Sequence, residues 1–153
     1  MDINYHFHIL KTTRERAVGL LNRLTPKQLN QIPAGFNNNI IWNAAHCLAT
    51  QNLLTYGLCG QPFETDHTII DKFRKGTSPI DLVPQANIDH IKQELLKSSD
   101  LLLKAYSHKH FKHFTPYTTS YGITLDEIDN AIAFNNTHEG LHLGVMMAQA
   151  KLV

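Results

Sequence analysis

The sequence predicts an all-α protein, a four-helix bundle with a long crossover between its second and third helices. Four segments of the chain repeat apolar residues with the period of an amphipathic helix. No segment alternates convincingly with the period of two that marks a half-buried strand. Residues 61–86 contain three prolines and a glycine, which break any long element. Four helices joined by one long connection are typical of a four-helix bundle.

The first helix is expected to extend to about Leu24. Its apolar positions recur with helical period at Ile3, Phe7, Leu10, Ala17, Val18 and Leu21. Thr25 and Pro26 end this helix, and they can begin a short extra turn because proline fits the first position of a helix. Pro33, Gly35 and the three asparagines that follow predict a connector.

The second helix is expected to begin after Asn39, because an asparagine side chain can cap the free N–H groups of a first turn. We expect it to end near Gly57 or Gly60, since glycine commonly follows the last turn of a helix. The crossover over residues 61–86 comes next, and a short helix around Ile69–Arg74 fits inside it.

The third helix is expected over about residues 87–106, where an apolar stripe of isoleucines and leucines faces charged residues on the other sides. A second connector with a proline and a glycine follows. The fourth helix is expected to open with a capping box, in which Thr124 is the N-cap and Glu127 lies three residues later. It then continues through Met146.

The bulk composition describes one ordinary globular domain, residues 1–153. Apolar residues make up 42% of the chain and charged residues 18%, so the chain can bury a core. A net charge of +1 without a basic stripe argues against nucleic acid or an anionic membrane as a partner. With no apolar run that could span a bilayer and no secretory leader, we expect a cytoplasmic protein. Cys47 and Cys59 are expected to be reduced, small apolar side chains.

Two histidines four residues apart, His138 and His142, are the most informative feature of the fourth helix. Their spacing places both imidazoles on one face, one turn apart, as two ligands of a single metal ion require. His46 lies in the middle of the second helix, on a face that we expect to be buried. If the two helices pack face to face, the chain has a three-histidine metal site. The alternative is three buried polar residues with no metal, since ten histidines make such a pair possible by chance.

The segment from His138 to His142 also matches the H-E-x-x-H pattern of zinc proteases, in which the glutamate polarises a water molecule. We reject a protease, because only eleven residues follow and none of them can be the third ligand. Glu139 points about 100° away from His138 on a helix, so we interpret it as a surface residue or one that supports a ligand. Asn43 and Asn135 precede the histidines by three residues, and we interpret them as helix-surface residues, with hydrogen bonding to a ligand as the alternative.

Two segments carry a resemblance to a known family. The segment NNNIIWNAAHCLATQNLLTYGLCG resembles the second-helix segment of the DinB-like (DinB/YfiT) family, whose motif near NxIxWxxxH supplies a first metal ligand. The segment THEGLHLGVMMAQ resembles the closing segment of that family, which supplies two more. The resemblance implies a four-helix bundle that holds a divalent metal ion on His46, His138 and His142.

The resemblance also implies a range of activities. Characterised members include transferases and isomerases that use bacillithiol, mycothiol or glutathione, and members often form homodimers. We therefore expect zinc or nickel as the cofactor and a small-molecule substrate, and the first function to consider is transfer of a low-molecular-weight thiol. A metal-dependent hydrolase is the second function. The alternative from another functional class is a non-catalytic protein. It would bind metal, or it would be an interaction module in which the three histidines hold the bundle together.

Overall fold

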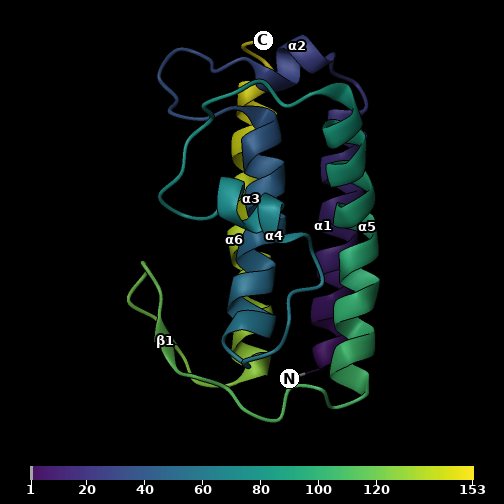
Figure 1. Ribbon diagram of the computed structural model, residues 1–153, viewed down its shortest axis with the longest axis vertical. Helices are drawn as coiled ribbons and strands as arrows, with labels where there is room; N and C mark the ends of the chain where they lie inside the picture. The colour runs from purple at the N-terminus through teal and green to yellow at the C-terminus, as the bar shows by residue number, and fades with distance from the viewer. Residues whose placement is uncertain (1) are drawn as a thin grey trace.

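The computed structural model describes residues 2–153, and it is mainly helical (Figure 1). Four long helices build the bundle: α1 (Ile3–Leu21), α3 (Ile40–Asn52), α5 (Gln85–Ser107) and α6 (Ile128–Gln149). The shorter elements are α2 (Pro26–Asn30), the π-helical turn η1 (Leu53–Gly57), α4 (His67–Phe73) and the strands β1 (Tyr117–Thr118) and β2 (Thr124–Leu125). The predicted all-α four-helix bundle is confirmed.

The bundle closes because α1 and α3 each contact both α5 and α6. In Figure 1, α3 and α5 run in the same direction, and α1 and α6 run the opposite way. The predicted crossover makes this possible, because residues 58–84 return the chain to the end of the bundle at which α3 began. The short helix predicted near Ile69–Arg74 is present within the crossover as α4, and it packs on α3.

The predicted starts of two helices are confirmed by their caps. Asn39 accepts a hydrogen bond from the backbone N–H of Trp42 at 2.9 Å, which fixes the first turn of α3. Thr25 and Gln28 form a reciprocal capping box at α2, with Pro26 in the first helical position.

The predicted capping box of the fourth helix is wrong. Thr124 lies in β2, where its hydroxyl meets that of Thr118 across the hairpin at 3.0 Å, and α6 begins only at Ile128. Gly122 makes the turn between the strands with a φ of 75°, a left-handed conformation that glycine adopts readily. The expectation of no strands is also wrong, because strands of two residues are too short to show a period of two.

The core extends along the whole bundle and is deepest around α3. Every residue of this helix except Thr50 is buried, since α4, α5 and α6 surround it. Cys47 and Cys59 are buried free thiols, as predicted. Among the described residues, no helix is both long and apolar enough to cross a membrane.

Candidate metal centre

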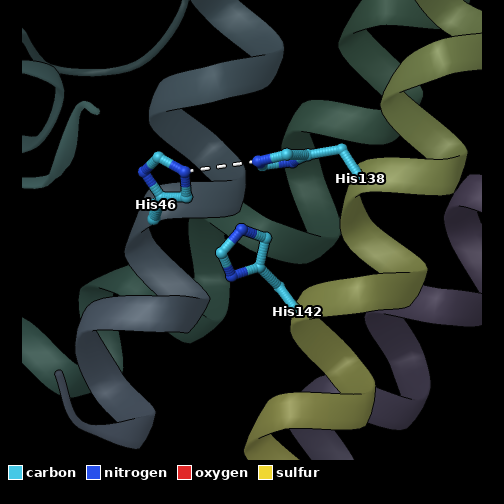
Figure 2. Close-up of side chains that lie close together, drawn as sticks. All are labelled: His46, His138 and His142. Carbon is cyan, nitrogen blue, oxygen red and sulfur yellow. Dashed lines mark hydrogen bonds between the residues drawn. The ribbon is translucent and has the colours of Figure 1, made fainter. Parts of the chain in front are cut away.

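The three histidines singled out in the sequence come together between α3 and α6. Figure 2 shows the His46 ring reaching from α3 toward the rings of His138 and His142 on α6. The ring centroids lie 4.4 to 5.1 Å apart. One ligand nitrogen from each ring can be chosen so that all three lie within 4.8 Å of one another. The cluster could therefore hold one metal ion.

His46 is held in the orientation that a ligand needs. Its Nδ1 lies 2.6 Å from the backbone oxygen of Phe73, the last residue of α4. A carbonyl oxygen can only accept, so Nδ1 carries the hydrogen and Nε2 has the lone pair. The Thr50 hydroxyl lies 3.3 Å from this Nε2. Trp42 stacks on the ring at 4.7 Å with an interplanar angle of 11°, which restricts its rotation.

His142 is oriented by an amide in the same way. Its Nδ1 lies 2.8 Å from Oδ1 of Asn43 on α3. The Asn43 amide nitrogen faces acceptors on Asn38, Asn39 and Gln149, which fixes Oδ1 as the acceptor toward the histidine. Nε2 of His142 therefore has a free lone pair. The interpretation of Asn43 as a surface residue is wrong, since it is buried and supports this histidine.

His138 is the least constrained of the three. Its Nε2 lies 3.2 Å from Nε2 of His46, the contact drawn as a dashed line in Figure 2. Its Nδ1 is buried, and no described residue donates to it or accepts from it. Two of the histidines are thus oriented by hydrogen bonds from Nδ1, and the third by its place beside them.

The electrostatic surroundings keep the cluster neutral at pH 7. Burial, followed by the neighbouring His142 and His46, lowers the pKa of His138 to about 3. Burial, followed by the nearby His46, lowers the pKa of His142 to about 4. Burial also lowers the pKa of His46, while its hydrogen bond to Phe73 acts in the opposite direction. Neutral imidazoles are the form that binds a metal ion.

These pKa shifts predict that the metal-stripped protein loses stability in mild acid. Between pH 6.5 and about 4 an unfolded chain protonates His138 and His142, whereas the folded chain keeps them neutral. The free energy of unfolding is therefore unaffected by these two histidines above pH 6.5, and it falls as pH decreases through that value. Well below pH 6.5 the slope approaches about 1.4 kcal/mol per pH unit for each histidine.

Urea unfolding in EDTA-containing buffers at several pH values between 7.5 and 4.5 measures this slope. The matched comparison is a double variant, His138→Gln with His142→Gln, because glutamine does not titrate in this range. The variant should show a shallower decrease. Equal slopes for both proteins would mean that the two histidines titrate alike in the folded and unfolded states.

The glutamate of the H-E-x-x-H segment has a different partner. Glu139 is 2% exposed and receives two hydrogen bonds from Arg14 of α1, at 2.6 and 2.9 Å. Asn135 donates a third hydrogen bond to it at 2.8 Å. The interpretation of Glu139 and Asn135 as surface residues is therefore wrong. Arg14 also donates to Ser98 and to the backbone of Leu95 on α5, so the network joins three helices.

The histidines open onto a pocket of about 590 Å³. Its walls are mainly apolar and come from the end of α3, from η1 and from α6: Leu53, Leu54, Gly57, Leu58, Phe134 and Leu141. Residues on and near the hairpin complete it, namely Tyr117, Thr119, Ser120 and Tyr121, together with Lys75 from the crossover. These last residues were missed in the sequence analysis, which identified only a connector with Pro116 and Gly122 in the hairpin region.

The chain matches a family model described as the DinB superfamily over residues 9–146. The match includes most of α1, all of α3 and α5, and α6 through Met146, and hence the three clustered histidines. No curated protein matches the chain significantly.

Proposed function

This chain belongs to the DinB superfamily, and we propose that it is a divalent-metal-dependent transferase that acts with a low-molecular-weight thiol. The observation that carries the proposal is the convergence of His46, His138 and His142 at a pocket large enough for a small molecule. The lone pairs of His46 and His142 are directed by fixed hydrogen-bond partners, which is how proteins orient imidazole ligands.

Zinc and nickel are the ions that we propose first, because imidazole suits both. His46, His138 and His142 would hold the ion and leave a position for a further ligand, and the bound ion would supply a lowered pKa to a thiol or a water that entered there. The chain's own contribution is to position that group against the apolar wall formed by residues such as Phe134 and Leu141.

Thiol transfer is favoured over hydrolysis by the side chains around the pocket. The described residues that line it include no aspartate or glutamate, and Glu139 is held by Arg14. Hydrolysis usually needs such a group to give the leaving group a proton, whereas a thiolate that displaces a good leaving group needs no such acid. The protein's own thiols are poor nucleophiles, since burial raises the pKa of both Cys47 and Cys59. The attacking thiol should therefore come from a second substrate.

A conjugation assay tests this proposal. We expect tag-free protein loaded with zinc or nickel to accelerate the reaction of a small thiol, drawn from a panel with cysteine and glutathione, with 1-chloro-2,4-dinitrobenzene. The sulfur forms a bond to the ring carbon, chloride leaves, and the thiol proton passes to the buffer. Mass spectrometry of the thioether measures the product.

The controls are the metal-stripped protein and the His142→Ala variant, both of which should have only the uncatalysed rate. Hydrolysis of p-nitrophenyl acetate without any thiol, by loaded protein alone, would favour the hydrolase instead. A loaded protein that accelerates neither reaction over broad panels of thiols, electrophiles and esters would favour the non-catalytic alternative.

A further inference from the structure

We propose that the pocket beside the three histidines binds a substrate with an apolar body and one carboxylate, and that Lys75 holds the carboxylate. This inference names the substrate class of the proposed transferase and rests on that function for what happens at the histidines. The inference has two requirements. The pocket must favour one negative charge near Lys75, and the rest of its wall must be apolar.

The charge of the pocket supports an anionic substrate. Of the described residues that line it, Lys75 is the only lysine or arginine, and none is acidic. Imidazole ligands carry no negative charge, so the three histidines would not offset the positive charge of an ion bound between them. A pocket lined in this way attracts an anion and repels a cation.

Lys75 is available for such a ligand. Among the described residues, three other lysines form ion pairs: Lys11 with Asp100, Lys92 with Asp89 and Lys97 with Glu94. In residues 2–153 no ion pair or hydrogen bond of the Lys75 ammonium group is present. An unpaired ammonium at the wall of an acid-free pocket is well placed to meet a carboxylate.

Lys75 lies close enough to the histidine cluster for one small substrate to reach both. Phe73, whose carbonyl orients His46, lies two residues before Lys75, so their Cα atoms are at most about 8 Å apart. One short segment after α4 therefore contributes both to the histidine cluster and to the anion contact. A ligand held by Lys75 can extend its body along the pocket with its other end near the histidines.

The remaining wall suits an apolar body. Leu53, Leu54 and Leu58 line one side, and Phe134 and Leu141 of α6 line another. A pocket of about 590 Å³ falls in the range of small-molecule sites, which are mostly apolar with a few polar groups that fix orientation. A single lysine matches a single carboxylate better than it matches a ligand with several charges.

Binding of three compounds with one common body tests the inference. The probes are 4-phenylbutyrate, 4-phenylbutan-1-ol and 4-phenylbutylamine, titrated by calorimetry into the full chain, both metal-stripped and zinc-loaded. We expect the acid to bind most tightly and the amine most weakly. Lys75→Met should weaken binding of the acid about five- to tenfold and leave the alcohol unchanged.

The matched control is Lys72→Met, which removes the same charge from α4 at a residue that does not line this pocket. It should change the affinity for the acid less than twofold, and Lys75→Arg should retain most of it. Equal affinity of the acid for the wild-type chain and Lys75→Met would overturn the inference, as would equal binding of acid and alcohol.

Metal analysis of the same samples separates this inference from the proposed function. Binding of the acid that depends on Lys75, in a chain that takes up no metal, would uphold the inference and remove the metalloenzyme. Binding that requires zinc and does not change in Lys75→Met would mean that the carboxylate meets the metal, and the inference would fail while the metal site stood.

Discussion

Replacing Arg14 with methionine should lower the free energy of unfolding by about 3–5 kcal/mol, a large part of the stability of a typical domain. Arg14 is 1% exposed, and its guanidinium neutralises the carboxylate of Glu139, which is 2% exposed. Without Arg14 the carboxylate keeps only its hydrogen bond from Asn135 in a site that water does not reach. Urea denaturation followed by circular dichroism measures the loss.

A double variant shows whether Arg14→Met is destabilising because it leaves a buried carboxylate without a partner or because it removes packing contacts. Arg14→Met combined with Glu139→Leu removes both charges, and buried pairs replaced by apolar residues often cost little or nothing. We therefore expect the double variant to be more stable than Arg14→Met alone. Arg16→Met, at an exposed position two residues later, should change stability by no more than about 0.5 kcal/mol. A double variant less stable than the single variant would contradict this account.

This network shows where prediction from the sequence ends. Arg14 and Glu139 are 125 residues apart, and no local pattern relates them. One signal was present: Arg14 occupies a position of the apolar stripe of its helix, between Leu10 and Ala17. Ser98 does the same on α5, between Leu95 and Leu102. A polar residue in a buried stripe indicates that a partner exists, but the partner is known only when the helices are placed.

The histidine cluster could be predicted further because its signals are local. The spacing of His138 and His142 places them on one face wherever the helix forms. His46 lies in a segment so apolar that every side of its helix had to be covered, and the structure buries it. The partner of Asn43 could not be predicted, since its hydrogen bond to His142 depends on how α3 and α6 are rotated against each other.

The hairpin was missed for a related reason. A capping box and a short strand use the same residue types, since a threonine both caps helices and favours extended backbone. Thr124 adopts the extended form because Thr118 is available to pair with it after the turn at Gly122. The hairpin formed in this way places four residues at the pocket: Tyr117, Thr119, Ser120 and Tyr121. Helical periodicity in the sequence could not have indicated their position.

Replacing His138 with alanine should remove metal from the protein. We expect about one zinc or nickel ion per chain in the wild type and almost none in the variant, because two ligands bind far more weakly than three. A loss in affinity of more than a hundredfold is expected, since even groups that only support a ligand contribute ten- to a hundredfold. Elemental analysis of tag-free protein measures the metal content, because the histidines of a tag would bind metal themselves.

Thermal stability gives an independent measurement of the same site. A ligand at one hundred times its dissociation constant stabilises the folded state by about 2.7 kcal/mol, so zinc should raise the melting temperature of the wild type. The His138→Ala variant should lack this increase, whereas His90→Ala, at an exposed residue of α5, should keep it.

Trp42 is the only tryptophan of the chain, and it stacks on His46. Nickel should therefore quench the tryptophan fluorescence of the wild type and leave that of His138→Ala unchanged. Metal content and zinc response equal in the wild type and His138→Ala would show that the ligand set is wrong. A wild type that takes up no zinc or nickel would leave the histidines as buried polar residues, stabilised by Phe73 and Asn43 and without a catalytic role.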